Sequence, residues 1–327
     1  MKQVIVDTDP GVDDVAALLL ALNSPELEVL AFTTVYGNAS VETCTANLLR
    51  VLAANGRYDI PVYRGAGKPL LRPASPGWAS HIHGSDGLGG LTAAESPAGG
   101  QEDRVTRSNS LVPEVADRHA ALAIIESVFA QPGNVSILAL GRLTNVALAL
   151  ALNPGVAAAV REIVVMGGAV TVPGNVSQVA TANLHEDPEA AAIVYDSGAP
   201  IVQVGLDVCN RVTVSPAQLQ RLSESSSSAT QLLVKATSGL RDAYIRTGRI
   251  GPEEGVRYND LPAVAYAVDP ALFSSRPALV RIETHSELTR GQTVASWDSD
   301  DSNAEICLDV DAEALTALFT ERVSALG

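Results

Sequence analysis

The chain has 327 residues, 46% of them hydrophobic, and a formal net charge of −15. This length allows one large α/β domain or two smaller ones, and the excess of acids argues against binding to nucleic acid or to an anionic membrane surface. No apolar run approaches the ~20 residues that a membrane span needs. Three widely separated cysteines form no CxxC pair, which indicates buried thiols in a reducing compartment. Since an apolar run begins almost at Met1 and leaves no room for a signal peptide, we expect a cytoplasmic protein.

The first dozen residues join a short apolar strand to a cluster of acids. Residues 4–6 are Val-Ile-Val, a β-branched run that predicts a buried strand. Pro10-Gly11 ends this strand, and apolar residues at helical spacing predict a helix that begins near position 13. The strand end and the helix start therefore hold four carboxylates, those of Asp7, Asp9, Asp13 and Asp14. Ligands of open α/β sheets bind at this end of the strands.

Four acids this close need compensation, because neighbouring like charges raise one another's pKa. A helix N-terminus stabilises an acid by roughly 0.3–1 kcal/mol, so a turn with a helix cap would use one or two of the four. A divalent cation would offset more of the repulsion, and all-oxygen ligation suits a hard ion such as Ca²⁺ or Mg²⁺. The pattern favours a cation site over a capped turn.

Strands and helices then alternate, which predicts a doubly wound, mostly parallel sheet with helices on both faces. The runs that predict further strands are residues 27–35, 60–63, 135–140, 162–166 and 201–206. Helices are expected at residues 40–55, 114–130, 145–153, from 187, from 215 with a turn at 223–228, at 259–268 and at 311–323. Residues 276–310 alternate more like antiparallel strands near the C-terminus. We find no repeat and no linker, and therefore expect one domain over residues 1–327.

Small polar residues follow several of the expected strands. They are Asn38, Asn175, Asn183 and Asp260, the last at the start of a helix. Each alone is more often a turn or cap residue, but the loops that end parallel strands converge on one pocket. Amides and carboxylates suit vicinal hydroxyl groups, so a sugar is the natural ligand. A third carboxylate from Asp260 would add to the cation site.

Residues 7–14, Asp-Thr-Asp-Pro-Gly-Val-Asp-Asp, resemble the DTDPGxDD signature of the inosine-uridine-preferring nucleoside hydrolases. The resemblance extends, in order and spacing, from residue 3 to about residue 268, through segments 33–38, 139–145, 166–168, 174–177 and 183–191. It implies an enzyme that hydrolyses the N-glycosidic bond of a ribonucleoside to free base and ribose. Its expected partner is a small nucleoside or other N-riboside, and the chain is expected to form a homodimer or homotetramer.

By this resemblance, a single Ca²⁺ lies at the bottom of the pocket. Its implied protein ligands are Asp9, Asp14, Asp260 and the backbone carbonyl of Leu140. The ion also holds a water and the ribose 2′- and 3′-hydroxyls, and Asp9 is the general base that takes the proton of this water as it attacks C1′. The transition state is oxocarbenium-like, as in glycoside hydrolysis generally.

The resemblance also implies the residues that bind the substrate. Ribose hydroxyls would be held by Asp13, Asn38, Asn183 and Asp260. Asn175 would reach the 5′-hydroxyl, Met166 belongs to the implied substrate-binding set, and Asp7 would support the loop from behind. Trp78, Tyr244 and Tyr258 lie in segments that border the base pocket in relatives.

Two positions depart from the family pattern. Relatives commonly have Glu two residues before the Asn at 183, where it binds the 5′-hydroxyl, and this chain has Thr181. Many relatives have His before the late Asp as the acid for the leaving base, and this chain has Asn259, which is no acid near neutral pH. His81 or His83 could take that role. The second is favoured because it lies in a His-Gly-x-x-Gly-Leu pattern that matches the family's lid-side histidine, within a long Gly- and Pro-rich loop at residues 64–112.

Two other functions compete with nucleoside hydrolysis. A haloacid-dehalogenase-like phosphatase also has Asp-x-Asp after its first strand, but it needs Thr or Val where Gly11 stands, and Lys235 is poorly placed for its later lysine. A calcium-dependent sugar- or nucleoside-binding protein without activity is the second alternative, motivated by Thr181 and Asn259. The complete set of acids favours catalysis. Hydrolysis of an unusual N-riboside, rather than of a common nucleoside, stays open as an alternative.

Overall fold

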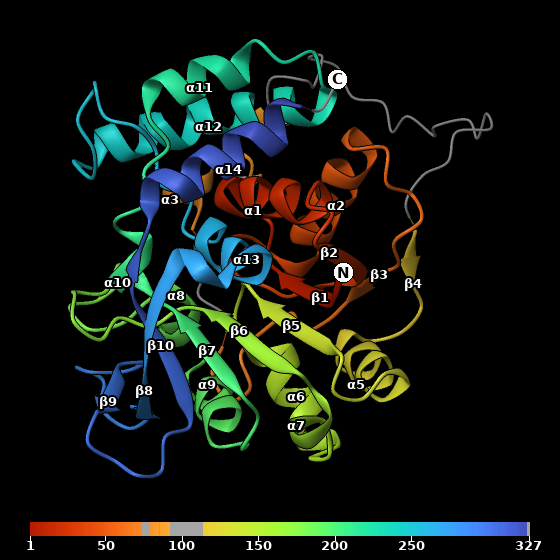
Figure 1. Cartoon of the computed structure of the whole chain (residues 1–327), viewed down its shortest axis with the longest axis vertical. Helices are drawn as coiled ribbons and strands as arrows, with labels where there is room; N and C mark the ends of the chain where they lie inside the picture. The colour runs from red at the N-terminus through yellow and green to blue at the C-terminus, as the bar shows by residue number, and fades with distance from the viewer. Residues whose placement is uncertain (74–78, 85, 92–113, 326–327) are drawn as a thin grey trace.

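The computed structural model describes residues 1–73, 79–84, 86–91 and 114–325. A ten-stranded sheet crosses this part of the chain in the order β4-β3-β2-β1-β5-β6-β7-β10-β8-β9 (Figure 1). Its strands are β1 (Lys2–Thr8), β2 (Leu27–Thr34), β3 (Val62–Arg64), β4 (Val115–Ala116), β5 (Val135–Ala139), β6 (Glu162–Met166), β7 (Ile201–Val204), β8 (Phe273–Ile282), β9 (Thr293–Ser296) and β10 (Ala304–Val310). Neighbouring strands from β4 to β10 are parallel, and β8 pairs antiparallel with both β10 and β9.

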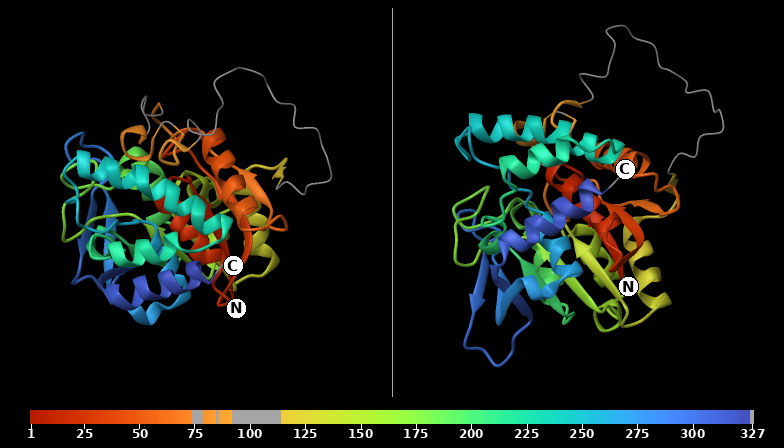
Figure 2. Two further views of the ribbon diagram at one scale, coloured as in Figure 1. Left: turned by 90° about the horizontal axis from the view of Figure 1, so that it is seen from above. Right: turned by 45° about the horizontal axis from the view of Figure 1, so that its top comes forward.

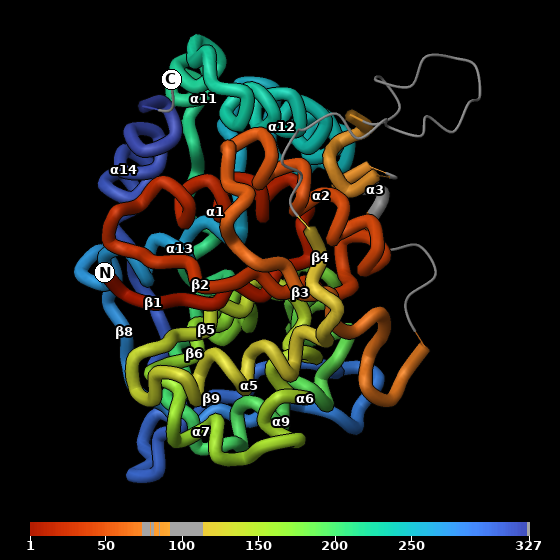
Figure 3. Tube along the Cα trace, turned by 90° about the vertical axis from the view of Figure 1, so that its right-hand side faces the viewer, coloured from red at the N-terminus to blue at the C-terminus, as the bar shows by residue number. Residues whose placement is uncertain are grey.

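Helices cover both faces of the sheet (Figures 1 and 3). One face carries α1 (Val12–Leu22), α2 (Val41–Ala54), α10 (Leu206–Cys209), α11 (Pro216–Ser223), α12 (Ser228–Arg246), α13 (Leu261–Val268) and α14 (Ala312–Ser324). The other carries α5 (Ala120–Ala130), α6 (Thr144–Leu152), α7 (Val156–Ala159) and α9 (Pro188–Tyr195). Figure 2 shows α12 as an outer layer that passes over α1 and α2.

The sequence of β1 explains why the sheet is buried on both faces. Val4 and Val6 belong to the apolar cluster on the α1 side, and Ile5 belongs to the cluster on the α6 side. All three side chains are fully buried. A central parallel strand therefore reads as a continuous apolar run rather than as an alternation of polar and apolar residues.

The strand order reverses at β1, which pairs with β2 on one side and with β5 on the other. The connections after β1 and β5 leave toward opposite faces, since α1 and α6 pack on opposite sides of the sheet. Such a switch point opens a crevice at the carboxyl ends of the strands. The expected fold class is confirmed by this topology, and the loops after β1, β2, β5 and β6 meet at the crevice.

Some expected boundaries were wrong. Residues 114–130 do not form one helix, because β4 occupies Val115–Ala116 and α5 begins only at Ala120, capped by the side chain of His119. The segment 276–310 is antiparallel only in part, since β10 runs parallel to β7.

Residues 74–78, 85 and 92–113 of the expected long loop lie outside the described residues. No helix within the described ranges is long and apolar enough to cross a membrane.

Candidate active site

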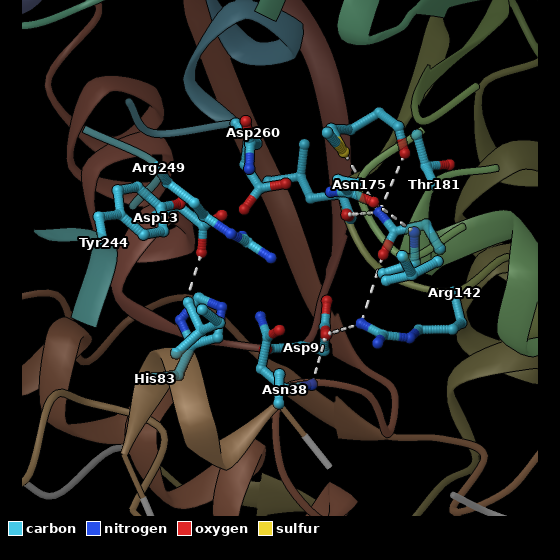
Figure 4. A pocket seen from close by; sticks show the side chains of 18 residues that line it. Asp9, Asp13, Asn38, His83, Arg142, Asn175, Thr181, Tyr244, Arg249 and Asp260 are labelled. Atoms are coloured by element: carbon cyan, nitrogen blue, oxygen red, sulfur yellow. Dashed lines mark hydrogen bonds and ion pairs between the residues drawn. The ribbon is translucent and has the colours of Figure 1, made fainter. Parts of the chain in front are cut away.

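A pocket lies at the switch point, and Figure 4 shows the side chains that surround it. Residues from seven segments line it: the loops after β1, β2, β5 and β6, the short helix α3 (Ser80–His83), the end of α12 with the chain after it, and the chain around the start of α13. The residues predicted to bind substrate all line it, together with Asp9, the predicted general base; they are Asp13, Asn38, Met166, Asn175, Asn183 and Asp260. The sequence-based expectation that strand-end loops converge is confirmed.

Asp9 is held by neighbours on both sides. Its Oδ2 accepts from the backbone N–H of Asn38 at 2.8 Å and from Arg142 Nη1 at 2.5 Å. The close approach of other loops depends on glycine, because a Cβ at Gly37 would lie 2.1 Å from Asp9 Oδ2 and a Cβ at Gly141 would lie 2.5 Å from Asp9 Oδ1. Burial raises the pKa of Asp9 well above its usual value, while Arg142 opposes the shift.

Asp14 organises the loop between β1 and α1. Its Oδ1 accepts from the hydroxyl of Thr8 at 2.5 Å, and its Oδ2 accepts from the N–H of Gly11 at 2.9 Å. The same Oδ2 accepts from Asn38 Nδ2 at 3.0 Å, and this amide also donates to the carbonyl of Asp9 at 3.1 Å. The acid at the third position of α1 therefore caps its own helix and ties it to the loop after β2.

Asp13, Asp14 and Asp260 form a buried carboxylate triad. Each offers an oxygen, and these oxygens lie within 4.8 Å of one another. Burial raises the pKa of Asp13 to about 6 and that of Asp260 well above its usual value, and the neighbouring aspartates raise the latter further. Asp13 Oδ1 is buried without a hydrogen bond. Such a set of buried, mutually repelling oxygens fits a hard divalent cation.

His83 faces the same triad from α3. Its Nδ1 accepts from the N–H of Val12 at 3.3 Å and lies 3.7 Å from Asp13 Oδ1. In a neutral ring, acceptance at Nδ1 places the proton on Nε2. The side chain is 6% exposed, so His83 belongs to the pocket wall rather than to the surface. The side chain of His81 is outside the described part of the structure.

The amides of the far wall order the loops as well as line the pocket. Asn183 Nδ2 donates to the carbonyl of Leu140 at 2.6 Å and to that of Met166 at 3.0 Å. Asn175 Oδ1 accepts from a backbone N–H of α8 (Ala182–Glu186) at 3.0 Å. The hydroxyl of Thr181 accepts from the N–H of Gly168 at 3.0 Å, so the residue that departs from the family pattern holds the loop after β6.

Other predicted residues lie away from the pocket. Asp7 is buried behind it, where it accepts from Thr33 at 2.6 Å and from Asn145 at 2.8 Å, in line with a supporting role. The hydroxyl groups of Tyr258 and Thr237 share a hydrogen bond, and the Tyr258 ring packs on Phe319 in the core. Tyr244, in contrast, lines the pocket. Trp78 lies outside the described residues.

Sequence reasoning missed two arginines in the pocket wall. Arg142 is 2% exposed and pairs with Asp9 and, through Nε at 3.0 Å, with Glu186. Its place directly after a buried strand was the available signal. Arg249 follows α12, stacks over the ring of Tyr244 at 5.7 Å, and extends its guanidinium toward the pocket in Figure 4. No spacing pattern in the sequence marks Arg249.

Comparison with known proteins places this chain in a family. The family model described as inosine-uridine preferring nucleoside hydrolase matches residues 4–317. A probable uridine nucleosidase 2 of Arabidopsis thaliana is 35% identical, over 98% of this chain and 97% of that protein. The non-specific ribonucleoside hydrolase RihC of Escherichia coli is 36% identical, over 97% of each chain.

A solved structure gives the same result for the fold. The purine-preferring ribonucleoside hydrolase from Gardnerella vaginalis superposes with a TM-score of 0.88 at 29% identity, covering 99% of each chain. The names of these relatives differ in the base they specify, whereas the family match spans nearly the whole chain. The chain therefore belongs to the inosine-uridine preferring nucleoside hydrolase family, whose chemistry is N-glycosyl hydrolysis.

Proposed function

We propose that this protein hydrolyses the N-glycosidic bond of a ribonucleoside, with Asp9 as general base. The observation that carries the proposal is the meeting of Asp9, Asp13 and Asp260 in one pocket at the switch point of the sheet, with Asp14 buried beside Asp13 and Asp260. Asn38 joins Asp9 to Asp14 and adds an amide beside them. This arrangement offers both an acceptor for a proton and several acceptors for ribose hydroxyls.

Calcium is the proposed metal, held by the carboxylates of Asp9, Asp14 and Asp260 and by the carbonyl of Leu140. The fit is supported by Asp14 and Asp260 of the buried triad, whose oxygens lie close together, and by Asp9, whose charge also raises the pKa of Asp260. A carbonyl has two lone pairs, so that of Leu140 can bind a cation while it accepts from Asn183. When bound, calcium would supply Lewis acidity toward water and ribose hydroxyls and would neutralise the acids.

The side chains then have separate tasks. Asp9 accepts the proton of the attacking water, and the guanidinium of Arg142 keeps its carboxylate oriented. Asp13, Asn38, Asn183 and Asp260 hold the ribose hydroxyls, so that C1′ faces the water. Positive charge develops on the sugar ring as the base departs, and the neighbouring carboxylates stabilise it.

His83 is the proposed acid for the leaving base. Asn259 also lines the pocket but has no proton to give near neutral pH. The imidazole lies beside Asp13, and because its Nδ1 accepts from the N–H of Val12, the proton of the neutral ring is on Nε2, from which it can be donated. Tyr244, buried in the same wall, offers a face on which the base can stack.

Ribose release from inosine, uridine and nicotinamide riboside tests this function. We expect release from at least one of them and its loss in the Asp9→Ala variant. If calcium binds and no riboside is cleaved, the second candidate is correct, namely a calcium-dependent nucleoside-binding protein. That candidate, and the hydrolysis of an unusual N-riboside, draw support from Thr181 and Asn259, which replace two polar groups of the family pattern.

Two further properties belong to this proposal. We propose a homodimer or homotetramer, which light scattering of the purified protein would measure. We also propose a cytoplasmic location, supported by three buried cysteines that are all free thiols. Fractionation of cells would test the location.

A further inference from the structure

A second pocket adjoins the active site and differs from it in charge. It shares Asn175, Tyr244, Arg249 and Asn259 with the first pocket and adds Asn210 and Arg257. Its volume is about 260 Å³, compared with about 90 Å³ for the first. Because four lining residues are common to both, a substituent on a bound riboside can extend from one pocket into the other.

The residues that line the second pocket include two arginines and no acid. This composition is unusual in a chain with a net charge of −15, which has only 22 Lys and Arg against 37 Asp and Glu. The first pocket is mixed in charge, since Asp9, Asp13 and Asp260 line it together with Arg142 and Arg249. Cationic groups in a pocket whose lining holds no acid attract an anion.

The two guanidinium groups also lack a protein anion among the described residues. Arg257 Nε is buried and has no hydrogen-bond partner. Arg249 stacks on Tyr244 and forms no ion pair with a described acid. In contrast, Arg142 is satisfied by Asp9 and Glu186. A buried guanidinium N–H without an acceptor costs free energy, and an oxygen-rich anion would remove this cost.

We propose that the second pocket binds a phosphate or carboxylate group of the substrate through Arg249 and Arg257. The inference rests on the proposed function and names its substrate class, an N-riboside that carries a negative charge. Planar guanidinium groups bind both kinds of oxyanion in bidentate fashion. The charged group could be attached to the substrate at either of two positions. One is the 5′-position, because Asn175 lies at the proposed 5′-hydroxyl site, and the other is the base, because Tyr244 lies at the proposed base site.

Three probes separate these possibilities. Uridine is the neutral reference, uridine 5′-monophosphate carries the anion on the ribose, and orotidine carries a carboxylate on the base. The measured quantity is the ratio of kcat/KM for each anionic probe to kcat/KM for uridine. This ratio is compared among the wild type, Arg257→Gln and a control variant, Arg161→Gln. The control removes an exposed arginine that precedes β6, at the edge of the sheet opposite the pockets.

We expect Arg257→Gln to lower this ratio about 10-fold for one of the two anionic probes. Arg257→Lys should lower the ratio less, because it keeps the positive charge, and Arg161→Gln should leave the ratio unchanged. A loss confined to uridine 5′-monophosphate assigns the anion to the ribose, and one confined to orotidine assigns it to the base. Equal ratios in wild type and Arg257→Gln for both probes overturn the inference. Ribose release from uridine reports separately on the proposed function, so the failure of one is distinguishable from the failure of the other.

Discussion

The two sides of the substrate cavity are built in different ways. The acidic side consists of Asp9, Asp13, Asp14 and Asp260, which are all buried and which come from the loop after β1, the first turn of α1 and the residue before α13. The arginine side consists of Arg249 and Arg257, which lie in the segment between α12 and α13. Backbone amides and an asparagine hold Asp9 and Asp14 in place, whereas the arginines have no such partners among the described residues.

This difference separates chemistry from recognition. A carboxylate that must hold a cation and accept a proton needs fixed neighbours, and the acidic side has them in the loops after β1, β2 and β5. A group that recognises a substituent of the substrate can lie on a loop outside the sheet, because a substitution there does not disturb the core. The predictions below test whether the two sides act separately.

The largest effect is expected from Asp9→Asn. This change keeps the shape of the side chain and removes its capacity to take a proton, so kcat should fall by about 10²–10⁴-fold. Ribose release under substrate saturation measures it. Binding of the nucleoside, followed by calorimetry, should survive the change. A variant that retains more than about a tenth of wild-type kcat would remove Asp9 from the role of base.

Arg142→Met tests whether the acidic side depends on its buried cation. The change leaves Asp9 and Glu186 without their partner, and breaking a buried pair costs about 3–5 kcal/mol. Urea unfolding in the presence of a chelator measures the free energy of unfolding. The double variant Arg142→Met/Asp9→Asn is the control, and it should be more stable than the single variant. If Arg142→Met alone costs under about 1 kcal/mol, the pair does not support the site.

His83→Gln should reduce activity according to the leaving group. For uridine, whose base needs a proton, kcat should fall about 10²-fold. For p-nitrophenyl riboside, whose leaving group departs as a stable anion, the loss should be much smaller. Steady-state kinetics on both substrates give the comparison. Equal losses on the two would mean that His83 acts by position alone and not as an acid.

Calcium should stabilise the acidic side without help from the arginine side. At about 100 times the Kd, the ion adds about 2.7 kcal/mol, which corresponds to a rise in Tm of several degrees. Burial raises the pKa of the proposed ligands Asp9, Asp14 and Asp260, so protons compete with the ion, and the shift in Tm should be smaller at about pH 5.5 than at about pH 8. Arg257→Gln should keep the shift. A shift that grows as the pH falls would contradict the proposed ligands.

The parts of this molecule that were predictable from sequence are those with local signals. The Val-Ile-Val run of β1, the acids after it and Asp187-Pro188 at the start of α9 each follow from neighbouring residues, and all were confirmed in the structure. The convergence of Asn38, Asn183 and Asp260 followed from one rule about strand ends in parallel sheets.

The rest depends on contacts between distant segments. The pairing of Arg142 with Asp9 joins residues 133 positions apart, and no local pattern announces it. β10 pairs parallel with β7 and antiparallel with β8, and the alternation of residues cannot reveal which strands become its neighbours. The second pocket arises where Asn175 and Arg257 come together from separate loops, and the sequence alone shows neither its volume nor its charge.

The central claim, that the acidic side uses calcium to hydrolyse a riboside, has one direct test. Protein freed of metal by chelation is assayed for ribose release from its best substrate, before and after calcium is returned. We expect little release without calcium and full recovery with it in the wild type, and no recovery in Asp14→Asn. Undiminished release by the calcium-free protein would contradict the claim.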